Sequence, residues 1–185
     1  MTVMAAAAGE HLFWLTSRAA GIVALLASSA SVGVGLAMAG RMIRGKGLEL
    51  RSVHEALSLA AMAAIVIHAG ALLFDGYVNL DLAGVTIPFA GSYRPFWTSL
   101  GIAGGWALIA LGLSYYARAR IGVARWRRLH RWTALVWVLS IGHALGEGTD
   151  AGRLWFLCAA GIVIVPAAVL LGLRHSSPTP TPTPR

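Results

Sequence analysis

The stretch VHEALSLAAMAAIVIHAGALLF, residues 53–74, decides the fold of this chain. It is apolar or small except at His54, Glu55, Ser58 and His68. About 20 residues that rise 1.5 Å each are needed to cross the hydrocarbon core of a bilayer, so this stretch is long enough to span it as an α-helix. The sequence therefore predicts a membrane-spanning helix that carries two histidines.

Four more runs of similar length and composition flank this stretch, at about 19–39, 96–117, 129–146 and 154–173. The chain is 57% hydrophobic with charge on only 12% of its residues, whereas soluble domains carry charge on about a quarter. The short-period alternation of a transmembrane barrel does not occur. We expect an all-α fold, a polytopic membrane helical bundle of about five transmembrane helices.

The basic residues lie mainly in two of the connections between these runs. They are Arg41, Arg44, Lys46 and Arg51 in the first, and Arg118, Arg120, Arg125, Arg127 and Arg128 in the second. Loops rich in Lys and Arg stay in the cytoplasm, which predicts an external N-terminus and a cytoplasmic C-terminus. The net charge of +8 thus indicates topology and not a nucleic-acid groove. No basic segment precedes the first apolar run, so we expect no cleavable signal peptide.

Four of the six histidines fall inside two expected spans, where ionisable residues are costly and point to function. His54 and His68 are 14 residues apart, and His130 and His143 are 13 apart, which gives about 20 Å of helix rise in each case. The two spans run parallel, so His54 can meet His130 at one depth and His68 can meet His143 at another. Two stacked bis-histidine sites are predicted.

The spacing of the second pair conflicts with an ideal helix. An offset of 13 residues rotates one side chain by about 140° from alignment with the other. Helix crossing, local 3₁₀ or π geometry, or different histidine rotamers would have to absorb this rotation.

The four histidines could also have other roles. Polar side chains also join membrane helices by hydrogen bonds, but four histidines at matched depths are many for that role alone. A single zinc or copper ion fits less well, because the pairs lie far apart and no cluster of Cys or carboxylates joins them.

The residues around these histidines resemble the ferric-reductase-like transmembrane domain family. This family includes the membrane parts of NADPH oxidases and ferric reductases, and the haem-binding subunit of the bacterial methionine sulfoxide reductase system. The resemblance rests on HEAL at His54–Leu57 with His68, on WRRLHRW at Trp126–Trp132 with His143, and on WLTSRAAG at Trp14–Gly21. It implies that two b-type haems are bound, with iron ligated by His54, His68, His130 and His143.

The resemblance also implies transmembrane electron transfer, as the haem component of an oxidoreductase. We expect five spans instead of six and no flavin and nicotinamide module like that of the oxidases, and therefore a separate flavoprotein or membrane quinol as donor. The acceptor would be periplasmic or extracellular: ferric iron, oxygen or a partner reductase. The five-span form and the Arg-, Ala- and Gly-rich composition favour a location in a bacterial cytoplasmic membrane. A small non-redox transporter or haem-handling protein is the alternative.

The remaining expectations concern the edges of the haem domain, which should comprise residues 1–175. The Pro-Thr tail at 176–185 is expected to be disordered. The loop at 76–95 is predicted to be either a lid over the outer end or an interfacial connector. Arginines near both faces are candidate partners of the haem propionates: Arg127, Arg128 and Arg131 on one side, and Arg18, Arg94 and Arg153 on the other.

Overall fold

The structure is a computed structural model that describes residues 2–40, 42 and 47–176. Helices make up most of this part, and no strand occurs in it, which confirms the expected all-α class. The helices are α1 (Thr2–Ala39), α2 (Gly47–Leu72), α3 (Leu82–Thr86), α4 (Pro95–Leu113), α5 (Arg118–Ile121), α6 (Val123–His130), α7 (Thr133–Glu147) and α8 (Leu154–Ser176).

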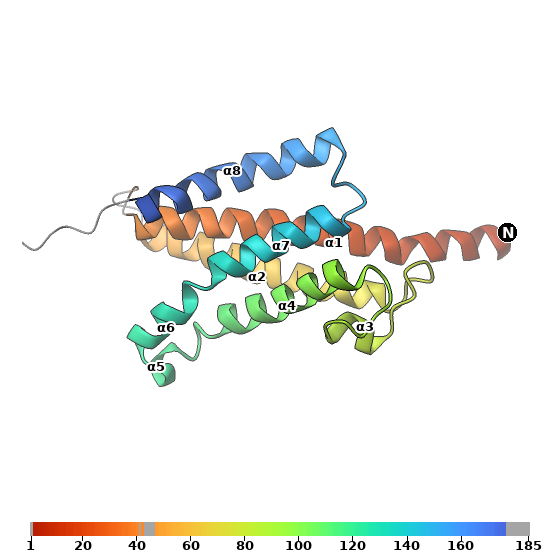
Figure 1. The fold of residues 1–185 in the computed structure, drawn as a ribbon, viewed down its shortest axis with the longest axis horizontal. Helices are drawn as coiled ribbons and strands as arrows, with labels where there is room; N and C mark the ends of the chain where they lie inside the picture. Colours follow the sequence, from red (N-terminus) through yellow and green to blue (C-terminus); the bar gives the residue numbers. More distant parts are fainter. Residues whose placement is uncertain (1, 41, 43–46, 177–185) are drawn as a thin grey trace, which may run out of the picture.

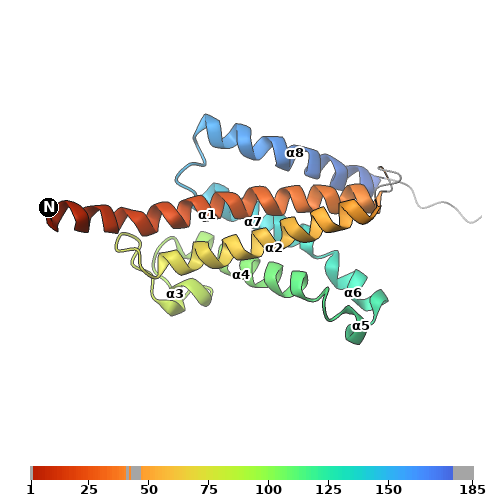
Figure 2. The same cartoon turned by 180° about the vertical axis from the view of Figure 1, so that it is seen from behind.

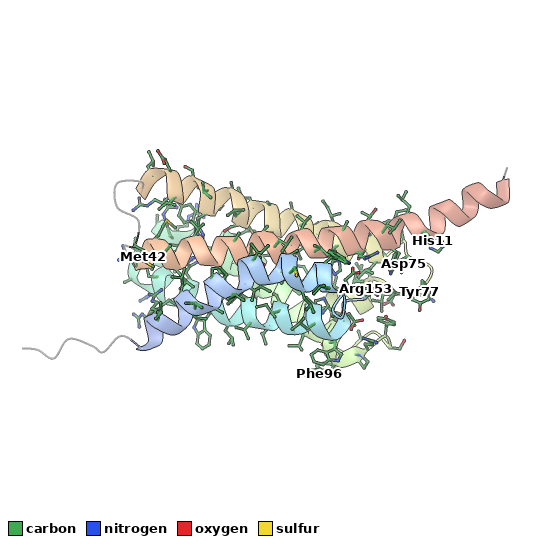
Figure 3. All side chains as sticks on the ribbon, turned by 90° about the horizontal axis from the view of Figure 1, so that it is seen from above. His11, Met42, Asp75, Tyr77, Phe96 and Arg153 are labelled. Atoms are coloured by element: carbon green, nitrogen blue, oxygen red, sulfur yellow. The ribbon has the colours of Figure 1, made fainter. Side chains whose placement is uncertain are left out.

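The long helices form a bundle around α1. Helix α1 packs along α2 and also contacts α7 and α8, while α4 packs along α7 (Figure 1). Seen from behind, α1 and α2 lie side by side over most of the length of α2 (Figure 2). His11, Asp75 and Phe96 lie at one end of the bundle and Met42 at the other (Figure 3). We call these the His11 end and the Met42 end.

Four helices are long and apolar enough to cross a membrane. They are His11–Ala39, Gly47–Leu72, Pro95–Leu113 and Leu154–Arg174. Many of their apolar side chains face outward, for example Val66 at 60% and Ile162 at 75% exposure. In water such surfaces would be unfavourable, whereas lipid chains cover them without cost. Four of the five expected spans are thus present as long apolar helices.

The fourth expected span, 129–146, is not one continuous helix. Helix α6 ends at His130, a turn follows at Arg131 and Trp132, and α7 begins at Thr133. The Thr133 hydroxyl donates a hydrogen bond to the carbonyl of His130 at 2.6 Å, which closes the last turn of α6. Helix α7 has 15 residues, or roughly 22 Å of rise, so it is the shortest of the five main helices.

The connection at 76–95 contains α3 and packs against the side of α4. The indole of Trp106 donates to the carbonyl of Thr86 at 2.9 Å, and the amide of Phe89 donates to the Ser99 hydroxyl at 2.7 Å. Both hydrogen bonds attach the 76–95 connection to α4, as in the interpretation of this loop as a connector. In the expected tail, Ser176 is the last residue of α8, and 177–185 lie outside the described residues.

Candidate functional site

The structure brings the four predicted histidines together in the predicted pairs. The imidazole centroids of His54 and His130 are 6.1 Å apart, with ring planes inclined by 88°. Those of His68 and His143 are 6.3 Å apart, inclined by 71°. Helix α2 supplies one ring to each pair, and α6 and α7 supply the others. The first pair lies toward the Met42 end and the second toward the His11 end.

The break between α6 and α7 explains how a 13-residue spacing matches a 14-residue one. His130 is the last residue of α6, and His143 lies within α7 beyond the turn at Arg131 and Trp132. The rotation of about 140° that a continuous helix would impose is therefore absorbed in this turn. Both rings can face α2 without distortion of either helix.

Three of the four histidines are anchored through Nδ1 to a backbone carbonyl. The acceptors are the carbonyls of Ser17 for His68 at 2.8 Å, of Ser31 for His54 at 2.9 Å, and of Trp97 for His143 at 2.8 Å. A carbonyl oxygen only accepts, so Nδ1 must carry the proton in each case. In a neutral ring, Nε2 then keeps its lone pair, which is the tautomer that a metal ligand requires.

His130 is anchored differently. Its ring stacks on Trp126, with centroids 5.1 Å apart and planes inclined by 25°. Its Nδ1 and the Nε1 of Trp126 are both buried and have no hydrogen-bond partner within the described part of the chain. Buried polar atoms are rarely left in this condition. Two nitrogens that can donate thus lie in the wall of this site without an acceptor.

Glycines make room for three of the rings. A Cβ placed on Gly101 would lie 2.6 Å from the ring of His143, and one on Gly21 would lie 3.0 Å from that of His68. A Cβ on Gly35 would lie 3.1 Å from the ring of His54. Real Cβ atoms rarely approach a neighbour so closely. The position of each imidazole therefore depends on the absence of a side chain on the facing helix.

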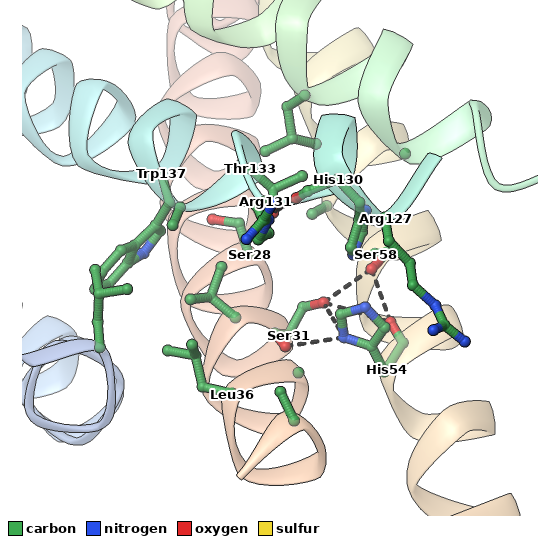
Figure 4. A pocket seen from close by; sticks show the side chains of 18 of the residues that line it. Ser28, Ser31, Leu36, His54, Ser58, Arg127, His130, Arg131, Thr133 and Trp137 are labelled. Carbon is green, nitrogen blue, oxygen red and sulfur yellow. Dashed lines mark hydrogen bonds between the residues drawn. The ribbon is translucent and has the colours of Figure 1, made fainter. Parts of the chain in front are cut away.

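A cavity of about 890 Å³ opens beside the His54/His130 pair. Its walls include Leu36, Met62 and Leu108, and Trp137 closes it at 2% exposure. Figure 4 shows Ser31, Ser58 and His54 linked by hydrogen bonds in this cavity, with His130 and Arg127 nearby. Four basic side chains also line it: Arg127, Arg128, Arg131 and Arg174. The cavity is thus lined by both apolar and cationic side chains.

The arginines at the His11 end are held by protein groups or lie exposed. The guanidinium of Arg18 forms a two-point ion pair with Asp150, at 2.5 and 2.6 Å. Arg94 donates to the carbonyl of Gly146 at 2.8 Å, and Arg153 is exposed. The expected arginine partners for an anionic group are therefore better placed at the Met42 end.

Sequence reasoning missed the residues that hold the rings, namely Ser17, Gly21, Ser31, Gly35 and Gly101. A signal for four of them exists in the sequence. Ser17–Gly21 (SRAAG) and Ser31–Gly35 (SVGVG) share the pattern Ser-x₃-Gly and are 14 residues apart, the same interval as His54 and His68. Of the other histidines, His11 is exposed, and the side chain of His175 lies outside what the structure describes.

Elsewhere in the described ranges, no three or more His, Cys, Asp or Glu side chains come close enough to hold a metal ion. Each histidine pair therefore offers two protein ligands. Comparison of the chain with protein-family models, curated proteins and solved structures gives no match.

Proposed function

We propose that each histidine pair ligates the iron of one b-type haem, and that the chain carries electrons across a membrane between the two. The spacing of the rings carries this proposal. A metal–imidazole bond is about 2.0–2.1 Å long and the ring centre lies roughly 1.2 Å beyond the nitrogen, so two rings that share one metal ion would have centroids no more than about 6.6 Å apart. The observed 6.1 and 6.3 Å fall just within this limit.

The chemistry of each pair supports a haem over a bare metal ion. A metal held by only two imidazoles needs its other ligands from a non-protein group, which a porphyrin supplies. Nδ1 anchoring on carbonyls is also the usual support of metal-bound histidine, because it fixes the tautomer and raises ligand basicity. Three of the four rings have this support.

The cavity beside His54 and His130 has the character that a haem needs. Its apolar walls suit a macrocycle, and its arginines suit anionic propionates. The unpartnered donors on Trp126 and His130 lie in the same wall. At the other pair, Gly21 and Gly101 leave the space that the rings of His68 and His143 occupy.

Bound haem would supply one-electron redox chemistry at each site. The two imidazoles of each pair would be the protein ligands of that iron, and ligation by two histidines favours electron transfer over oxygen binding. The two sites share α2, so both proposed haems would be held along one bundle. We propose a flavoprotein or membrane quinol as donor, and ferric iron, oxygen or a partner reductase as acceptor.

The proposed orientation places the Met42 end in the cytoplasm of a bacterial cell. Helices α5 and α6 at this end carry Arg118, Arg120, Arg125, Arg127 and Arg128, and Lys- and Arg-rich connections stay on the cytoplasmic side. A reporter fused after Arg174 should then be cytoplasmic, and one inserted near Asp81 external. The opposite pattern would reverse the proposed direction of electron flow.

The decisive experiment is a pyridine haemochrome assay on the purified protein, with a dithionite-reduced minus oxidised spectrum. We expect about two b-type haems per chain, both low-spin. His11→Ala changes an exposed histidine and is the matched control. A haem content near zero in the intact chain would reject the proposal and leave the pairs as hydrogen-bonded helix contacts.

A further inference from the structure

Helix α1 contacts the two histidines of α2 through the same small motif, used twice. Ser17 and Ser31 are 14 residues apart on α1, as are Gly21 and Gly35. Fourteen residues are close to four helical turns, so both copies lie on one face of α1. Since α1 and α2 pack along each other, the first copy meets His68 and the second meets His54.

The two copies make the same kinds of contact with their histidines, and in the second copy the Ser31 hydroxyl also lies 2.8 Å from that of Ser58. In the first, Nδ1 of His68 lies 2.8 Å from the Ser17 carbonyl and 3.0 Å from its hydroxyl, which also donates to the His68 carbonyl at 3.1 Å. In the second, Nδ1 of His54 lies 2.9 Å from both the carbonyl and the hydroxyl of Ser31. The Ser31 hydroxyl lies 3.4 Å from the His54 carbonyl. In each copy one serine thus contacts both the ring and the backbone of the histidine.

These serines differ from their neighbours on the same helix. A serine in a helix usually bonds a carbonyl in the preceding turn, as Ser28 and Ser29 do with the carbonyl of Leu25. Ser17 and Ser31 instead direct the hydroxyl across to α2. All four are buried, at 0–6% exposure. Burial alone therefore does not explain the different contacts.

The glycine of each copy leaves room for the ring. A Cβ on Gly21 would lie 3.0 Å from Nδ1 of His68, and one on Gly35 would lie 3.1 Å from Cε1 of His54. The glycine lies one helical turn beyond its serine, on the same face of α1. The serine thus accepts the hydrogen bond of the ring, and the glycine leaves the space that the ring occupies.

We propose that Ser17 with Gly21 and Ser31 with Gly35 are two positioning modules, each of which sets the tautomer and orientation of one histidine ligand. The redox consequence rests on the proposed haem function. An acceptor for the Nδ1 proton makes the imidazole a stronger donor to iron, which stabilises the ferric state. Loss of the hydroxyl removes one of the two acceptors at Nδ1 and leaves the serine carbonyl in place, so it should raise the reduction potential of the haem at that pair by a limited amount.

The test is a spectroelectrochemical titration of the parent protein with Ser17→Ala, Ser31→Ala and Ser28→Ala. Ser17→Ala should shift only the component lost in His143→Ala, and Ser31→Ala only the component lost in His130→Ala. We expect a change of about two- to tenfold in the ferric–ferrous equilibrium, where tenfold corresponds to about 59 mV for one electron. Ser28→Ala should shift neither, and Ser17→Thr, which keeps the hydroxyl, should restore the parent potential.

Equal shifts in both components, or shifts no larger than that of Ser28→Ala, would overturn the positioning role while leaving the haems in place. A second measurement separates this result from failure of the proposed function. Histidine side-chain ¹⁵N NMR of the protein as purified, reduced with dithionite, reports the Nδ1 proton directly. If the protein holds no haem, a selective change at His68 in Ser17→Ala still supports the module, and an unchanged signal rejects it.

Discussion

The indole of Trp126 stacks on the imidazole of His130, with centroids 5.1 Å apart. His130 is the one predicted ligand whose Nδ1 has no hydrogen-bond partner among the described residues. The other three rings are fixed by a carbonyl, so this ring is held mainly by its neighbour on α6. Stacked aromatic pairs contribute about 0.5–1.5 kcal/mol beyond the area they bury. His130 should therefore be the most easily disturbed of the four ligands.

Substitution of Trp126 tests this view. Trp126→Ala removes the stacked ring and should speed haem loss from the His54/His130 pair by roughly two- to tenfold, while Trp126→Phe should keep most of the retention. Transfer of haem to an excess of apomyoglobin measures the rate. If Trp126→Phe loses haem as fast as Trp126→Ala, the indole N–H matters and the stacking does not.

Single ligand substitutions should separate the two sites. His54→Ala and His130→Ala should each remove the same spectral component, and His68→Ala and His143→Ala should each remove the other, because the pairs are 6.1 and 6.3 Å apart. Haem content should fall from about two to about one per chain in all four. Loss of one shared component by His54→Ala and His68→Ala, with both intact in His130→Ala, would contradict the pairing.

Gly101 should tolerate no side chain. A Cβ at this position would lie 2.6–2.8 Å from three atoms of the His143 ring, so Gly101→Ala must displace the ring or separate α4 from α7. We expect the His68/His143 component to become high-spin or to be lost, as read from the absorption spectrum. Gly142→Ala is the control, because a Cβ there meets nothing within 4 Å. Equal spectra for the two variants would show that the ring can move without cost.

The sequence predicted the pairs because depth and helix direction suffice to match residues on parallel spans. The break after His130 was not predicted, since composition places 129–146 in one apolar run and a turn at Arg131 and Trp132 depends on how α6 packs. The modules on α1 were missed for another reason. A serine and a glycine in a membrane helix are common packing residues, and only contact with α2 distinguishes Ser17 from Ser28.

The ion pair between Arg18 and Asp150 ties α1 to the connection between α7 and α8 near the His68/His143 pair. Asp150 is 5% exposed, and its two oxygens accept from two guanidinium nitrogens at 2.5 and 2.6 Å. Removal of Arg18 would leave the buried carboxylate of Asp150 without its cation. The resulting loss in the free energy of unfolding exceeds the net stabilisation that the ion pair provides. Because the Arg18 side chain is 33% exposed, solvent screening limits the loss to about 1–2 kcal/mol.

A double-mutant cycle in detergent measures this coupling. Arg18→Ala and Asp150→Ala should each lower the thermal unfolding midpoint, and the double variant should be less destabilised than the sum of the two, because neither charge is then left alone. Arg18→Lys should recover only part of the loss, since an ammonium cannot make the two-point contact. Arg153→Ala, an exposed arginine of the same connection, is the control. Additive effects of the two single variants would show that the pair does not hold α1 in place, and that the Ser17 module is positioned by the packing of α1 against the other helices.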